Sequence, residues 1–65
     1  MSPTYYLEEV NELLGSRRVL KANPYASRFE AMARASELAS TRRTFYVCNV
    51  VDASGRVLES KRGDK

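Results

Sequence analysis

The spacing of apolar and polar positions predicts one helix near the middle of the chain, over about Arg28–Ser40. Its buried face is expected to carry small and medium apolar side chains, at Ala31, Met32, Ala35, Leu38 and Ala39. Ser27 and Glu30 form a capping-box pattern at the start of this helix, and Pro24 is expected to end the element before it. Because the face is rich in alanine, we expect the helix to approach a sheet closely.

Strand patterns lie on both sides of this helix. Residues 44–51 are rich in aromatic and β-branched side chains, and a second strand is expected over residues 56–60. The connecting residues 52–55 predict a hairpin turn in which Gly55 takes the left-handed conformation. Before the helix, residues 18–22 alternate as a short strand.

Residues 4–14 fit two structures. Their aromatic and branched side chains suit a strand that pairs with residues 18–22 through a turn at Gly15. The same segment suits a helix, with Ser2 as N-cap, Pro3 at the first helical position and Gly15 beyond the last. We favour the strand, which gives a β-β-α-β-β domain of the α+β class. One helix then packs on one face of a mainly antiparallel four-stranded sheet, whereas the helical alternative gives α-β-α-β-β.

Size and composition limit what can stabilise such a fold. Residues 1–65 are expected to form a single small domain, with a net stability of only about 3–5 kcal/mol. Cys48 is the only cysteine and there is no histidine, which excludes an internal disulfide and a structural zinc site. A second copy of the chain could supply the missing stability, so a homodimer is one expectation.

The sequence also bears on location. It shows no signal-peptide pattern and no apolar run long enough to cross a bilayer, so we expect no membrane association. The unpaired Cys48 is typical of a protein in the reducing cytoplasm.

The composition argues against an enzyme. Without histidine there is no Ser-His or Cys-His pair to activate a nucleophile. Glu8 and Glu9 would point to opposite faces of a strand, and the three glycines are too scattered to form a phosphate-binding loop. Cys48 lies in mid-strand and is interpreted as a small buried residue. We expect a binding protein with no catalytic residue, no cofactor and no metal.

Two surfaces of the expected fold are candidates for binding. The topology brings basic residues from three parts of the sequence to one end of the domain, namely Arg17, Arg18, Arg42, Arg43, Lys61 and Arg62. The sheet face without a helix would expose apolar side chains, and the expected aromatic contacts are Tyr5, Tyr6, Phe45 and Tyr46. A third, thinner feature is the acidic opening at Glu8, Glu9 and Glu12. Solvated surface charge is the plain alternative for the charged features, and cover by long side chains is the alternative for the apolar face.

Residues 4–10 carry a resemblance to a known family. Their sequence, Thr-Tyr-Tyr-Leu-Glu-Glu-Val, resembles the opening strand of small phage proteins that act on the type I-F surveillance complex, the type I-F anti-CRISPR proteins. The layout that follows, with an alanine-rich helix starting near Ser27, is also similar, whereas the helix and hairpin sequences differ. The resemblance implies an inhibitor that docks on a large host complex through surface contacts. It assigns no functional residue to this chain.

These observations predict a small non-enzymatic interaction module. It would bind a host protein or protein–nucleic-acid complex and block it sterically, with arginines contacting carboxylates or phosphates. The net charge of +3 favours an acidic partner. The main alternative is a direct nucleic-acid binder, in which sheet aromatics stack on bases while arginines hold phosphates. A structural homodimer with no other partner is the third hypothesis.

Overall fold

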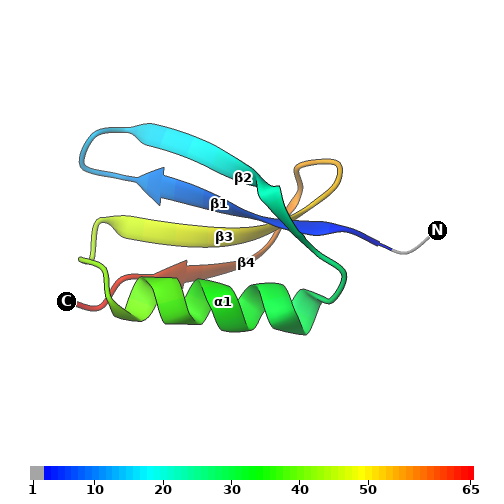
Figure 1. Ribbon diagram of the computed structural model, residues 1–65. Coiled ribbons are helices and arrows are strands. Elements are labelled where there is room, and N and C mark those ends of the chain that lie inside the picture. The colour runs from blue at the N-terminus through cyan, green and yellow to red at the C-terminus, as the bar shows by residue number, and fades with distance from the viewer. Residues whose placement is uncertain (1–2) are drawn as a thin grey trace.

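The computed structural model describes residues 3–65 as one helix packed on a four-stranded antiparallel sheet. The elements are β1 (Tyr5–Asn11), β2 (Ser16–Tyr25), α1 (Arg28–Ser40), β3 (Tyr46–Asp52) and β4 (Val57–Arg62). Within the sheet the strands lie in the order β2-β1-β3-β4, and each neighbouring pair is antiparallel (Figure 1). The α+β fold class and the β-β-α-β-β order predicted from the sequence are confirmed.

The ambiguous first segment forms β1, which lies between β2 and β3 and pairs with both. Its backbone groups are therefore satisfied by two neighbouring strands rather than within the segment, as they would be in a helix. Gly15, at φ 71°, closes the turn between β1 and β2 instead of ending a helix. The helical alternative for residues 4–14 is wrong, and Ser2, its expected N-cap, lies outside the described residues.

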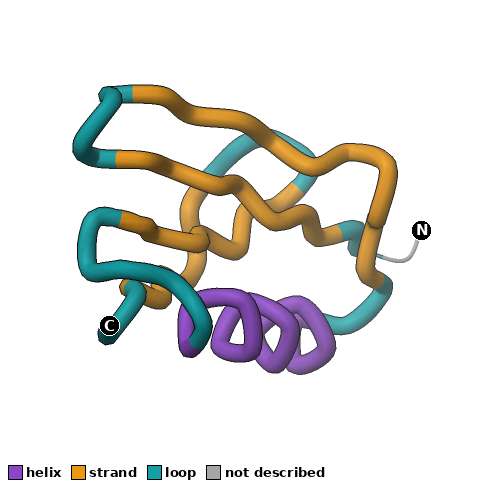
Figure 2. Tube along the Cα trace, turned by 60° about the vertical axis from the view of Figure 1, so that its left-hand side comes forward, coloured by secondary structure: helices purple, strands orange, loops and turns teal. Residues whose placement is uncertain are grey.

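Helix α1 begins and ends at the predicted residues. The Ser27 hydroxyl oxygen accepts hydrogen bonds from the backbone N–H groups of Phe29 (3.2 Å) and Glu30 (3.5 Å), which caps the first turn. The fully or almost fully buried positions of the helix are all alanines, at Ala31, Ala35 and Ala39. These small side chains let the helix lie close against one face of the sheet, as Figure 2 shows.

The bounds of three strands differ from the prediction. Strand β2 continues through Pro24, because an edge strand tolerates a residue that has no N–H to donate. Strand β3 begins two residues later than expected, since the chain is still turning at Thr44 and Phe45. Strand β4 extends to Arg62 and therefore includes Lys61.

The sheet has an inner face, which α1 covers, and an outer face without a helix. The core lies on the inner face and contains Leu7, Ala31, Ala35, Tyr46, Cys48 and Val50. Cys48 is buried there, as the sequence predicted, and this burial raises the pKa of its thiol. In the part of the chain that the structure describes, no helix has the length and apolar character needed to cross a membrane.

Candidate interaction surface

Two connections of the fold and the end of its last strand meet at one end of the domain. These are the turn between β1 and β2, the loop between α1 and β3, and the end of β4, all at the left of Figure 1. The predicted cations lie on these connections or on the strand ends beside them: Arg17, Arg18, Arg42, Arg43, Lys61 and Arg62. We call the surface formed by these three segments and the six cations the end surface.

Strand register sorts the cations on the strands into two rows. Arg17 is paired with Val10, Val10 with Val47, and Val47 with Arg62, so one row crosses the outer face. Arg18 is paired with Glu9, Glu9 with Cys48, and Cys48 with Lys61, so the next row crosses the inner face. The six cations therefore share one end of the molecule but are divided between two faces.

Carboxylates from the acidic opening accompany three of these cations. Arg18 Nη2 donates to Glu9 Oε1 at 3.0 Å, and Arg17 Nε lies 4.0 Å from Glu8 Oε2. Arg62 makes a two-pronged contact with the Glu12 carboxylate, in which Nη2 donates to Oε2 at 3.0 Å. The hydrogen bonds from Arg62 hold the pKa of Glu12 below its usual range. The acidic opening is thus part of the basic end and not a separate surface.

The loop that carries Arg42 and Arg43 is held in place by the chain that follows β4. The backbone N–H of Gly63 donates to the Tyr46 carbonyl at 2.8 Å, and that of Lys65 donates to the Arg42 carbonyl at 3.2 Å. A side chain at Gly63 would collide with the carbonyl oxygens of Arg42 and Arg43, so this close approach requires glycine. The end surface is therefore tied together by hydrogen bonds between distant segments.

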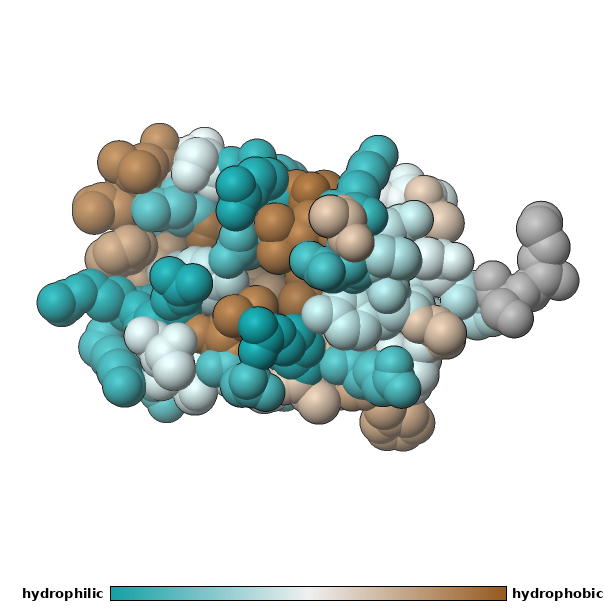
Figure 3. Space-filling model, in the orientation of Figure 1, coloured by the Kyte–Doolittle hydropathy of each residue, from teal (hydrophilic) through white to brown (hydrophobic). Residues whose placement is uncertain are grey.

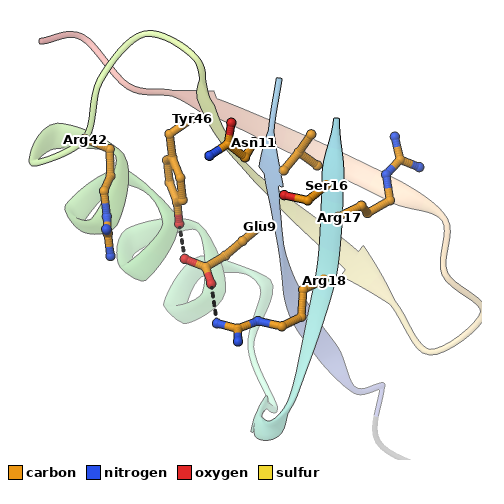
Figure 4. A pocket seen from close by; sticks show the side chains of 8 residues that line it. Glu9, Asn11, Ser16, Arg17, Arg18, Arg42 and Tyr46 are labelled. Atoms are coloured by element: carbon orange, nitrogen blue, oxygen red, sulfur yellow. Dashed lines mark hydrogen bonds and ion pairs between the residues drawn. The ribbon is translucent and has the colours of Figure 1, made fainter. Parts of the chain in front are cut away.

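An open groove of about 540 Å³ lies at this end, mainly on the inner face, and its lining reaches Val10 and Arg17 of the outer-face row. Its lining includes Glu9, Asn11, Ser16, Arg18, Arg42 and Tyr46, and we call it the Arg18–Arg42 groove (Figure 4). The Tyr46 hydroxyl donates to Glu9 Oε2 at 2.7 Å. The guanidinium carbon of Arg42 lies 5.2 Å from the centre of the Tyr46 ring, within the range of a cation–π contact.

Glu9 is the electrostatic centre of the groove. The hydrogen bond from Tyr46 lowers the pKa of this carboxyl most, and Arg18 lowers it further, against the opposing effect of burial. Burial and the hydrogen bond to Glu9 both raise the pKa of the Tyr46 hydroxyl. Glu9 is therefore held ionised between a neutral phenol and a guanidinium. This arrangement orients charge within the groove.

The four predicted aromatic contacts do not share one surface. Tyr46 is buried on the inner face, where Tyr5 also packs against the core. Tyr6 is half-buried and lines a hollow on the outer face with Val19 and Val51. Phe45 is half-buried in the loop before β3. The aromatic side chains are therefore divided between two faces and a loop.

The outer face is less apolar than the sequence pattern suggested, because polar side chains occupy its centre. Asn49 Nδ2 donates to Glu8 Oε1 at 2.9 Å, and the Ser60 hydroxyl donates to Asn49 Oδ1 at 2.6 Å. Glu8 and Asn49 are each only 8% exposed. This polar chain crosses β1, β3 and β4, and it separates Val47 from Val51 on the same face.

Sequence reasoning missed the two leucines in the β1–β2 turn. Leu13 and Leu14 are 72% and 76% exposed, and Figure 3 shows apolar surface at the free end of this hairpin. The turn is ordered, since the Leu14 N–H donates to Asn11 Oδ1 at 3.0 Å and the Glu12 N–H donates to the Phe45 carbonyl at 2.8 Å. Their position directly before Gly15 could have indicated that they lie in a turn and are exposed, but the structure of this segment was ambiguous from the sequence.

Comparison of the chain with protein-family models, curated proteins and solved structures found no match. The described residues contain no group of three or more side chains placed to hold a metal ion.

Proposed function

We propose that this domain is a non-catalytic interaction module that binds a protein partner through the end surface and blocks it sterically. The observation that carries the proposal is the ordered, exposed Leu13–Leu14 turn beside a cluster of cations. Inhibition by docking on a host protein complex is also what the resemblance of residues 4–10 to type I-F anti-CRISPR proteins implies.

The composition of the end surface supports a protein partner. Protein interfaces place apolar anchors at the centre of a patch and polar groups at its rim, and arginine is enriched among their strongest contacts. Here two exposed leucines lie in the turn that leads to Arg17 on β2, and Arg62 on β4 contacts Glu12, the residue before Leu13. Hydrogen bonds hold the turn before any partner arrives, which reduces the entropy lost on binding.

The geometry gives less support to direct nucleic-acid binding. A sheet that binds single strands needs exposed aromatic rings beside free cations. The four aromatic residues are divided between surfaces, and the Tyr46 ring already has Arg42 against it. Glu8, Glu9 and Glu12 also lie among the arginines, where they would repel a phosphate backbone.

A homodimer through the outer face is also less well supported. The centre of that face is a satisfied polar chain, and satisfied polar groups gain little from a second sheet. The edge strand β2 carries Arg17, Arg18, Lys21 and Pro24, which are typical of edges protected against pairing with another strand.

The test is capture of partners from bacterial lysate with the tagged protein, with and without nuclease. Three forms are compared: wild type, the double variant Leu13→Glu/Leu14→Glu, and the control Phe29→Glu. Phe29 is 82% exposed, but it lies at the start of α1, at the other end of the domain. We expect a stoichiometric protein partner that survives nuclease, is lost with the double variant and is kept with the control.

Two results would overturn the proposal. A partner that is lost on nuclease treatment would assign the domain to nucleic acid. A partner that the double variant retains would move the contact away from the end surface. Light scattering on the same three proteins checks for dimers, and a wild-type dimer that becomes a monomer only in the double variant would assign the turn to self-association.

A further inference from the structure

We propose that the Arg18–Arg42 groove binds a carboxylate side chain from an acidic segment of the partner. This inference rests on the proposed function for the class of partner, and it adds which chemical group is recognised and where. The groove lies directly beside the β1–β2 turn, because Asn11 and Ser16, which line it, form the last pair before that turn. A partner segment on the leucines would therefore pass over the groove.

The groove is open because α1 does not extend over this part of the sheet. The helix packs mainly on β3 and β4 and has its weakest contact with β2. The chain leaves the helix after Ser40, and the following loop brings Arg42 to the side of Tyr46. Figure 4 shows Arg42 and Arg18 on either side of the Tyr46–Glu9 pair, with the space between them open.

The two guanidinium groups have donors to spare. A guanidinium has five N–H groups, and Arg18 uses Nη2 for its bond to Glu9. Arg42 lies against the Tyr46 ring, and within residues 3–65 no carboxylate forms an ion pair with it. Asn11 and Ser16 add a neutral amide and a hydroxyl at the open end of the groove. An entering carboxylate would thus find charged and neutral donors together.

The local charge suits one carboxylate better than a polyanion. Glu9 forms an ion pair with Arg18 and also feels the charge of Arg42, so one carboxylate offsets only one of the two guanidinium charges and the other remains to attract a ligand. Because Glu9 is ionised and faces the same space, a chain of closely spaced phosphates would meet repulsion there. The Tyr46 hydroxyl is bonded to Glu9, Arg42 lies over its ring, and the residue is only 8% exposed, so Tyr46 offers little surface for stacking on a base. The groove therefore favours an acidic peptide over nucleic acid.

The experiment is an NMR titration of the full chain with a short glutamate-rich peptide at constant ionic strength. Resonances of the Arg18 and Arg42 side chains and of the Glu9 and Tyr46 amides report on the groove. We expect shifts that saturate in wild type and a dissociation constant roughly three- to fivefold higher for Arg42→Gln, as for an exposed ion pair. Glu9→Gln should lower the dissociation constant, because it removes the competing carboxylate and keeps an acceptor for Tyr46.

The matched control is Arg56→Gln, which removes the same charge from the β3–β4 turn at the opposite end of the domain. It should leave the dissociation constant unchanged. Shifts that do not saturate, or an equal loss in Arg56→Gln and Arg42→Gln, would show general charge attraction and overturn the inference. A short oligothymidine that displaces the peptide from these residues at lower concentration would overturn it in favour of nucleic acid.

Circular dichroism of each variant verifies the fold, and Arg42→Lys is the second variant if Arg42→Gln does not fold. Lysine keeps the charge but lacks the planar fork, so it should bind the peptide between wild type and Arg42→Gln. The two proposals fail separately. Saturable peptide binding without capture of a protein that depends on Leu13 and Leu14 would remove the proposed function and leave the groove. Capture of a protein that depends on the leucines, with no peptide binding in the groove, would support the proposed function and overturn the inference about the groove.

Discussion

Two neighbouring glutamates on β1 show how differently the two faces of the sheet are built. Glu9 points to the inner face, where it meets the Tyr46 hydroxyl and Arg18 at the open end of the helix-covered layer. Glu8 points to the outer face, where it accepts a hydrogen bond from Asn49 and is almost fully buried without any covering element. Helix α1 shields the inner face from water, whereas side chains of the sheet itself shield the centre of the outer face.

This difference separates two origins of stability. On the inner face, Leu7, Cys48 and Val50 are removed from water by the alanines of α1, so the gain is mainly hydrophobic. On the outer face, Glu8, Asn49 and Ser60 satisfy one another, so their burial adds little net stability but makes each partner costly to remove. A face that has satisfied its own polar groups has little need of a partner, which is why the end surface is the better candidate for binding.

The largest expected effect comes from the inner face. Leu7→Ala should cost roughly 2–5 kcal/mol, because it leaves a cavity between β1, β3 and the helix. That loss is comparable to the roughly 3–5 kcal/mol expected for the whole domain, so the variant should be largely unfolded at room temperature. Urea denaturation followed by circular dichroism measures it. Leu13→Ala, the same change at an exposed site, should stay within about 0.5 kcal/mol of wild type, and an equal loss in both would contradict the comparison.

The next effect tests the polar chain on the outer face. Asn49→Ala should cost roughly 1–3 kcal/mol, since it leaves the Glu8 carboxylate and the Ser60 hydroxyl without their partner. The double variant Glu8→Val/Asn49→Val should lose less stability than Asn49→Ala, because both partners are then apolar. Denaturation curves give the two free energies of unfolding.

The same double variant also makes the outer face apolar across β1 and β3. We expect it to self-associate, which light scattering would detect as a concentration-dependent increase in mass. A double variant that remains monomeric at every concentration would mean that the polar chain is not what keeps this face free of partners.

Two valines on β3 give a finer comparison. Val50 is completely buried under α1, whereas Val47 lies on the outer face beside Arg17 and Arg62. Val50→Ala should therefore cost about 1 kcal/mol more than Val47→Ala, since a cavity between two layers closes less readily than one beneath flexible side chains. Thermal unfolding of the two variants measures the difference. Equal losses would mean that the outer face is packed as tightly as the core.

Much of the fold could be predicted because its signals are local. Ser27, the run of alanines and Gly55 each specify a structure within a few residues, and the helix and the second hairpin follow from them. Residues 4–14 were different, because their local pattern suits a strand and a helix alike. Only the pairing of β1 with β2 on one edge and β3 on the other makes them a strand, and that pairing is not encoded in the segment itself.

The candidate site was predictable in outline only. The meeting of the cations at one end follows from the order of the elements, but their partners depend on register, which the sequence pattern leaves open. One residue of slippage would separate Glu9 from Arg18 and Glu8 from Asn49. Leu13 and Leu14 were missed for a related reason, since they belong to the segment whose local pattern suits a strand and a helix alike.

The smallest expected effect is a pH dependence on the inner face. The folded protein holds the pKa of Glu9 below its ordinary value, chiefly through the hydrogen bond from Tyr46. The ionised Glu9 carboxylate contributes its full stabilisation above the pKa of a glutamate in the unfolded chain, about 4.3. This contribution is lost as the pH falls through the lower pKa that Glu9 has in the folded protein. Glu12 and Asp52, whose pKa values are also lowered, titrate in the same sense.

Glu9→Gln should therefore make the acid limb of a plot of unfolding free energy against pH shallower without making it flat. Glutamine keeps an acceptor for Tyr46 but has no proton to gain over this range. Urea denaturation from about pH 6 to pH 3 measures both proteins. If Glu9→Gln had the wild-type slope, the inner-face carboxylate would gain nothing from Tyr46 and Arg18, and the contrast with Glu8 would not hold.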